Sequence, residues 1–148
     1  MKMIGCGMIL AAGALRIFSF RTREREAMSN LRDYIKLIDH VCLQIGYFSH
    51  PIGKILKSYG SPLGETVDEM HSTLQNNRLL HTDEIQALYE WISSIGNGYK
   101  DEQLKLCAYT KEKMVQFLSA REKDYPAKAK TNSALTLLGG ATLIVMFL

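Results

Sequence analysis

The two ends of this 148-residue chain are apolar over nearly the whole length that a membrane helix requires. Residues 3–20 carry one charge, Arg16, and residues 131–148 carry none. About 20 apolar helical residues cross the hydrocarbon core of a bilayer, and an arginine near a helix end can extend to the headgroups. We therefore expect transmembrane helices over residues 1–20 and 131–148, with a separate domain over residues 21–130.

A cleaved signal peptide is the alternative for the first segment. Lys2 would then be its charged region, residues 3–15 its apolar region and residues 12–14 a small-residue cleavage site. An arginine-rich stretch follows the apolar run at once, and basic residues next to a span tend to stay in the cytoplasm. We expect the first segment to be retained.

Charge divides the chain in the same way. Residues 26–120 hold 9 Lys/Arg and 12 Asp/Glu, whereas the remaining residues hold 9 Lys/Arg and only 3 Asp/Glu. The surplus forms two basic collars over residues 16–25 and 121–130, whose members include Arg16, Arg21, Arg23, Arg25, Lys128 and Lys130. These collars predict that the middle of the chain faces the cytoplasm, with both termini on the opposite side of a cell membrane. They also favour contact with anionic lipid, whereas the mildly acidic middle argues against nucleic acid.

The middle of the chain has a helical period throughout, which predicts an all-α fold: an antiparallel cytoplasmic bundle of five to six helices, flanked by the two transmembrane helices. Its first helix continues from the first span and ends near Pro51. Polar residues, including His40, are expected on the solvated face of that helix, opposite one apolar stripe: Leu31, Tyr34, Ile35, Ile38, Val41, Cys42 and Ile45.

Four further helices are expected. One follows Pro51, and another has Pro62 at its first position behind Ser61 as cap. Thr82 is the expected cap of the next, and Pro126 is expected to kink the last. The predicted inward residues of these four helices, in chain order, are Ile52, Ile55, Leu56 and Tyr59; Leu63, Val67, Met70 and Leu74; Ile85, Leu88, Tyr89, Ile92 and Ile95; and Leu104, Cys107, Ala108, Met114, Val115 and Leu118.

The stretch IGNGYKDEQLKL, residues 95–106, contains a G-x-G that resembles part of a phosphate-binding loop. Such loops follow a strand, whereas this one follows a predicted helix. Gly96 is better explained as the glycine that ends that helix, and Asp101 as an acid in the first turn of the next. The sequence therefore predicts a tight turn that is exposed to partners.

No sequence motif indicates an enzyme, and we expect no catalytic residue, cofactor or metal. Neither the four histidines nor the three cysteines have metal-ligand spacing, and the cysteines Cys6, Cys42 and Cys107 are expected to be small apolar residues of the core or of the lipid-facing surface. Small residues in the spans, Gly7 with Ala11 and Gly139 with Gly140, are candidate helix-packing positions.

Three strings occur in an order that resembles the stage III sporulation protein AB family of endospore-forming bacteria. They are the arginine-rich step at residues 21–25, the I-x-Y-x-x-x-P-[LI] pattern at residues 45–52, and the glycine turn followed by D-x-Q at residues 95–103. A C-terminal span closes the pattern. The resemblance covers essentially the whole chain.

The resemblance implies a non-enzymatic platform in the mother-cell membrane that faces the forespore. Such proteins belong to the channel between the two cells, called the feeding tube, and their cytoplasmic domain is similar to the F-protein domains of type II secretion systems. By that analogy the protein links a cytoplasmic secretion-type ATPase, stage III sporulation protein AA, to other membrane proteins. Gly96, Asp101 and Gln103 are the expected partner-binding residues.

Two other functions stay open on the sequence. One is a membrane-anchored enzyme whose site is assembled from scattered residues such as His81, Asp101 and Gln103. The other is a membrane-anchored helical adaptor or lipid-surface sensor, unrelated to sporulation, that uses its basic collars.

Overall fold

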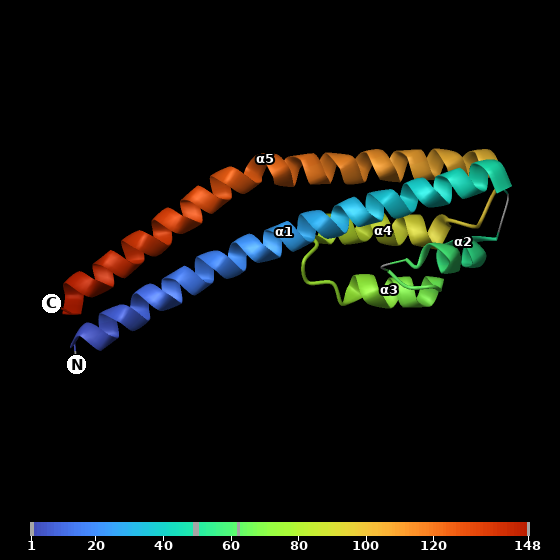
Figure 1. The fold of residues 1–148 in the computed structure, drawn as a ribbon. Coiled ribbons are helices and arrows are strands. Elements are labelled where there is room, and N and C mark those ends of the chain that lie inside the picture. The colour runs from blue at the N-terminus through green and yellow to red at the C-terminus, as the bar shows by residue number, and fades with distance from the viewer. Residues whose placement is uncertain (1, 49–50, 62, 148) are drawn as a thin grey trace. The chain divides into compact units, whose positions relative to one another are not determined.

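The computed structural model describes the backbone of residues 2–48, 51–61 and 63–147, and their side chains except at 2–10, 48, 140 and 143–147. In this part of the chain there is no strand, and the all-α prediction is confirmed (Figure 1). The elements in order are α1 (Lys2–Phe48), α2 (Ile52–Tyr59), α3 (Val67–Gln75), α4 (Thr82–Ser94) and α5 (Lys100–Phe147).

The chain divides into two compact units. One unit joins residues 1–26 to residues 120–148, and the other is formed by residues 27–119. Helices α1 and α5 belong to both units, because each runs through the boundary as a single helix. The three short helices belong to the central unit alone.

In the central unit, α1 and α5 are antiparallel neighbours held by two long-range polar contacts. Lys111 Nζ lies 2.6 Å from Asp39 Oδ1, and Lys100 Nζ donates to the Gly46 carbonyl at 2.5 Å. The later residue of α1 pairs with the earlier residue of α5, which fixes the antiparallel direction. The side chains of Asp39 and Lys111 are both more than two-fifths exposed, so their ion pair sets register more than it adds stability.

The apolar stripe predicted for α1 forms one wall of the core. Leu31, Tyr34, Ile38, Val41 and Ile45 are buried as expected, whereas Ile35 and Cys42 are partly buried. The Tyr34 hydroxyl accepts a hydrogen bond from Asn77 Nδ2 at 3.1 Å, so its polar end is satisfied inside the unit. Burial raises the pKa of Tyr34.

The solvated position predicted for His40 is wrong. The His40 ring lies 4.7 Å from the Tyr59 ring, centroid to centroid, and the residue is half-buried. It lies at the edge of the core because α2 packs over this part of α1. A helical wheel of α1 alone does not contain that neighbour.

The start predicted for α3 is also wrong. The Ser61 hydroxyl accepts from the Leu63 amide at 3.1 Å in a local turn, and Pro62 lies outside the described residues. The cap is Thr66, whose hydroxyl accepts from the Glu69 amide at 3.3 Å. Leu63 is therefore a buried turn residue rather than a helical one, and Val67, expected in the core, is 39% exposed.

The start of α4 is displaced by one residue from the prediction. His81 is the cap rather than Thr82, and the buried carboxylate of Glu84 accepts from the His81 amide at 2.7 Å. An acid at the third helical position stabilises a helix start by reaching back in this way. This bond explains how Glu84 can be 2% exposed without leaving that carboxylate oxygen unsatisfied.

The apolar faces of α4 and α5 are rotated slightly from those predicted. On α4, Leu88 and Ile92 are buried, but Trp91 takes the core position that the prediction gave to Tyr89, which is 43% exposed. On α5, Cys107 and Met114 are buried, whereas Ala108 and Val115 each follow a buried residue by one position and are exposed. Pro126 lies inside α5, which continues past it.

The position of the core on α1 can be tested with two leucines of that helix. Leu37 is fully buried and Leu43 is 58% exposed. Leu37→Ala is expected to lower the free energy of unfolding by about 2–5 kcal/mol because it leaves a cavity, whereas Leu43→Ala should change it by less than about 0.5 kcal/mol. Fluorescence of the buried Trp91 during denaturation measures both. Equal losses in the two variants would contradict the assigned core face.

Candidate functional site

The turn between α4 and α5 is built from glycines in left-handed geometry. The Ile95 amide donates to the Trp91 carbonyl at 2.8 Å, and Gly96 then follows with φ 90°. Gly98 has φ 111°, so two of three successive residues adopt a conformation that side chains disfavour. The geometry is that of a helix end, as the sequence indicates, and not of a strand-to-helix phosphate loop.

Close packing adds a second constraint at Gly96. A Cβ placed on this residue would lie 3.3 Å from Ile52 Cγ1 on α2. The turn thus contacts the start of α2 as well as joining α4 to α5. Of the three predicted partner-binding residues, Gly96 therefore has a structural function in the turn.

Gln103 holds the other side of the turn. Its side-chain amide donates to the Gly98 carbonyl at 2.9 Å, and its backbone amide donates to the Tyr99 carbonyl at 3.0 Å. Asp101 differs from Gln103, because it lies exposed in the first turn of α5. Of the three residues, Asp101 is the one with an exposed side chain.

Exposed aromatic residues lie beside Asp101. Tyr99 is 82% exposed at the start of α5, and Tyr47 is 79% exposed at the end of α1. The two chain segments are adjacent because Lys100 donates to the carbonyl of Gly46. We call Tyr47, Tyr99 and Asp101 the tyrosine-rich tip. The sequence reasoning placed Asp101 here but missed the tyrosines, since only the contact between the helices brings them together.

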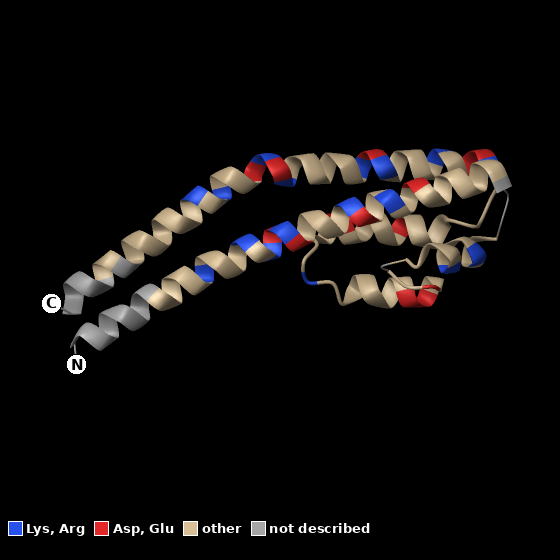
Figure 2. Cartoon of the chain, viewed as in Figure 1, with Lys and Arg blue, Asp and Glu red and all other residues tan. Residues whose placement is uncertain are grey.

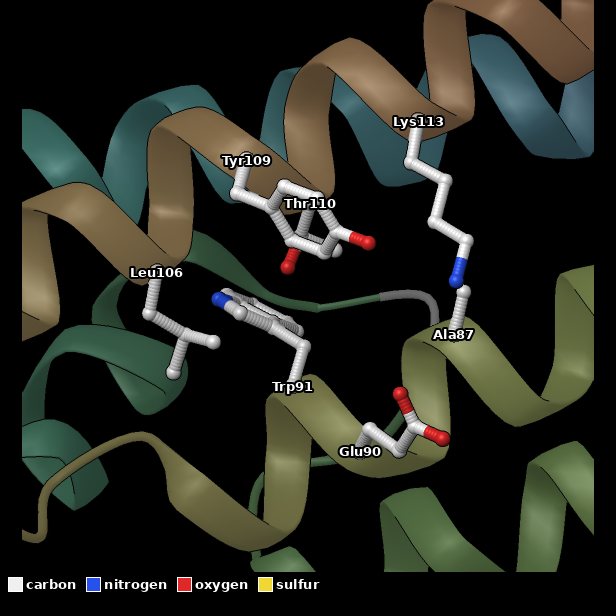
Figure 3. Close-up of a pocket in the computed structure, with 7 residues that line it drawn as sticks. All are labelled: Ala87, Glu90, Trp91, Leu106, Tyr109, Thr110 and Lys113. Atoms are coloured by element: carbon white, nitrogen blue, oxygen red, sulfur yellow. The ribbon is translucent and has the colours of Figure 1, made fainter.

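A small cleft lies between α4 and α5 (Figure 3). Its volume of about 30 Å³ is room for about one water molecule and is far below that of a small-molecule site. Trp91 forms its floor and donates through Nε1 to Cys107 Sγ at 3.5 Å. The lining residues are Ala87, Glu90, Trp91, Leu106, Tyr109, Thr110 and Lys113.

Cys107 has the character of a core residue. Burial raises the pKa of its thiol to about 11, so the thiolate is scarce near neutral pH. It is also fully buried. Both observations fit the apolar role that the sequence indicates for this cysteine.

The structure does not assemble the residues of the proposed enzyme alternative. His81 caps the start of α4, whereas Asp101 and Gln103 follow its end. A helix of 13 residues separates them, which is about 20 Å at 1.5 Å per residue. In the portion of the chain with described side chains, no cluster of three or more His, Cys, Asp or Glu residues is arranged to hold a metal ion.

The basic collars are formed by the parts of α1 and α5 that belong to the terminal unit. Arg16, Arg21, Arg23 and Arg25 are all exposed on α1. Figure 2 shows lysines and arginines as blue bands on both long helices, beside segments without charge. Lys128 and Lys130 on α5 are exposed as well.

Arg121 is the first residue of the second basic collar, but it is buried, unlike Lys128 and Lys130. Its side chain is only 6% exposed, and its NH1 group donates to Glu24 Oε2 at 3.2 Å. The pair joins α1 to α5 across 97 positions of sequence. Burying a charge is costly unless it is paired, and Glu24 supplies one such partner for Arg121.

The two helices of the terminal unit approach closely at Gly13. A Cβ on this residue would lie 2.9 Å from Thr136 Cγ2, closer than carbon atoms ordinarily pack. The packing positions predicted elsewhere differ: Gly139 has open space around it, and Ala11 is exposed. The surroundings of Gly7 and Gly140 are not described by the structure.

Hydroxyl groups in the second apolar segment are satisfied within α5. Those of Thr131, Ser133, Thr136 and Thr142 each donate to the carbonyl four residues earlier, at 2.8–3.0 Å. This bond removes the free donor from an otherwise apolar surface. It also explains how four hydroxyl residues fit into a stretch without charge.

Among the residues whose side chains are described, no helix combines the length and apolar character needed to cross a membrane. Residues 1–10, 140 and 143–148 of the two expected spans lie outside that set. The transmembrane helices therefore stay predictions.

Comparison with known proteins gives one family. The model of the stage III sporulation protein AB family matches residues 54–148, which is more than half of the chain. No curated protein matches, and no solved structure matches.

The strained turn can be tested by adding one methyl group. Gly96→Ala is expected to cost about 1–3 kcal/mol of unfolding free energy, because alanine disfavours φ 90° and its Cβ would crowd Ile52. The control is Gly53→Ala inside α2, where the Cβ has open space and alanine should stabilise by about 0.5–1 kcal/mol. Chemical denaturation measures both. A stable Gly96→Ala variant would show that this turn geometry is wrong.

The close approach at Gly13 can be tested by separating the helices. Gly13→Leu should push α5 away at Thr136, which exposes the collar backbone and raises tryptic cleavage at the collars several-fold. Gly139→Leu is the matched control, since Gly139 has open space. Unchanged cleavage in Gly13→Leu would argue against this helix pairing.

Proposed function

The chain belongs to the stage III sporulation protein AB family, and from this membership we propose that it is a non-enzymatic membrane platform of the channel between mother cell and forespore. In this role it joins a cytoplasmic secretion-type ATPase, stage III sporulation protein AA, to the membrane proteins of the complex. A role in sporulation follows from the family. The platform function goes beyond that role and is our proposal.

The observation that carries the proposal is the continuity of α1 and α5. Each helix begins in one unit and ends in the other without a break. The central unit is therefore connected to the apolar ends through two helices rather than through loops. An adaptor between a motor and a membrane requires such a connection, and an enzyme does not.

Membrane insertion of both ends is part of the proposal. Residues 131–148 carry no charge, and four of their hydroxyl groups are bonded to the helix backbone. Both features lower the cost of placing α5 in lipid. The basic collars then orient the central unit toward the cytoplasm of the mother cell, with both termini across the membrane.

The tyrosine-rich tip is the proposed docking surface for the ATPase. Tyrosine is one of the residue types that contribute most binding energy at protein interfaces. Asp101 adds a negative charge, while Gln103 and Gly96 hold the turn that presents it. The similarity to secretion F-protein domains that the sequence suggested is consistent with a docking role for this turn.

Co-purification after crosslinking in sporulating cells tests the proposal. Wild-type protein should recover the secretion-type ATPase. Asp101→Lys should lower that recovery about tenfold, because charge reversal at a binding hot spot costs more than about 1 kcal/mol. The matched control is Glu112→Lys, the same reversal at another exposed position of α5.

Two outcomes would contradict different parts of this proposal. Failure to recover any ATPase with wild-type protein would argue against the platform function. Recovery that is normal in Asp101→Lys would place the docking surface elsewhere on the bundle. Trp91 fluorescence shows whether each variant keeps its fold, since Trp91 is buried in the core.

A further inference from the structure

A second, larger cleft lies between the two helices of the terminal unit. Its volume is about 330 Å³, at the lower end of the range found for ligand sites. Phe20 of α1 forms one wall, and Ala127, Lys128, Thr131 and Asn132 of α5 form the other. No function described above uses this cleft.

The lining combines an apolar part with a small polar set. Phe20 and Ala127 offer carbon surface, whereas Asn132 offers amide donors and Lys128 an ammonium group. Thr131 donates its hydroxyl hydrogen to the Ala127 carbonyl at 3.0 Å, so it can only accept from a ligand. The donors available to a ligand are therefore those of Lys128 and Asn132.

The Lys128 charge is only loosely satisfied within the protein. Its Nζ lies 3.8 Å from Asp124 Oδ2, which is too long for a hydrogen bond, and both side chains are more than half exposed. An ion pair of this kind contributes little. The ammonium group is thus available to an anionic ligand that reaches the cleft.

The position of the cleft along the chain indicates which anion this is. Phe20 directly precedes the exposed arginines Arg21, Arg23 and Arg25, and Asn132 lies one residue inside the segment without charge. The cleft therefore lies where basic residues give way to apolar residues on both helices. At a membrane this is the level of the lipid phosphates.

We propose that this cleft binds one anionic phospholipid, with the phosphodiester held by Lys128 and Asn132 and the adjoining glycerol and acyl carbons against Phe20 and Ala127. The inference rests on the membrane insertion proposed above and goes beyond it, because it assigns a specific lipid site rather than a general attraction. A free phosphate would use the polar donors but would leave the apolar wall uncovered. The composition of the lining therefore favours a lipid over a soluble anion.

Lipid retention by the purified full-length chain tests this site. The protein is extracted in detergent, equilibrated with phosphatidylglycerol or phosphatidylcholine, washed, and its bound lipid is counted by native mass spectrometry. Lys128→Gln should lower retention of phosphatidylglycerol about tenfold, since the ammonium charge that pairs with the phosphate is lost. Lys130→Gln is the matched control: it removes the same charge from an exposed collar residue that does not line the cleft, and should change retention less than about twofold.

Asn132→Leu keeps the size of the side chain and removes its donors, so it should also lower retention several-fold if the site is correct. The inference is overturned if Lys128→Gln and Lys130→Gln lose lipid equally, because the attraction is then diffuse. It is also overturned if phosphatidylcholine is retained as well as phosphatidylglycerol, or if inorganic phosphate displaces the lipid at millimolar concentration.

A different experiment shows whether membrane insertion, on which the lipid site rests, is itself wrong. If the chain is not inserted, alkaline carbonate will release the wild-type protein from membranes of sporulating cells. If the protein resists carbonate but both cleft variants retain lipid like wild type, membrane insertion stands and only the lipid site is wrong.

Discussion

The antiparallel pairing of two helices of 47 and 48 residues is the constraint on which the rest of the structure depends. Because α1 and α5 are antiparallel neighbours, the chain between residues 48 and 100 must leave the end of one helix and return to the start of the other. The three short helices occupy that connection and cover the apolar stripe of α1. Polar contacts such as Lys111 with Asp39 set the register, while Leu37, Leu88, Trp91 and Met114 supply the apolar burial.

The antiparallel pairing of α1 and α5 also explains why the residues that resemble a binding or catalytic site have structural functions. Gly96, Gly98 and Gln103 form the turn that leads into α5, and Glu84 stabilises the start of α4 by accepting from the His81 amide. The exposed residues beside this turn include Asp101, Tyr47 and Tyr99, and tyrosines are suited to contact with a protein. In the terminal unit, exposed basic residues adjoin apolar segments, which is suited to contact with lipid.

The sequence predicted what depends on local periodicity and failed at the choice between neighbouring caps and at contacts between distant residues. The all-α fold, the stripe from Leu31 to Ile45 and the glycine turn all follow from spacing within one segment. The caps of α3 and α4 were misplaced because several residues in each stretch can cap, and the choice depends on Glu69 and Glu84 reaching back. Arg121 was assigned to a collar by its charge alone, and its burial against Glu24, 97 positions away, could not be predicted from the local sequence. His40 was misjudged for a similar reason, since only the packing of α2 buries it.

The central claim is a cytoplasmic bundle tied to a membrane by both ends, and its topology can be measured by cysteine labelling. Ser72→Cys places a thiol on an exposed position of α3, and Cys6→Ala with Cys42→Ala removes the cysteine of the first apolar segment and the half-buried one of α1. Cys107 contributes little background, because burial holds the pKa of its thiol at about 11. With an impermeant maleimide, we expect no labelling of the introduced thiol in intact sporulating cells and full labelling once the membrane is permeabilised. Labelling in intact cells would contradict it.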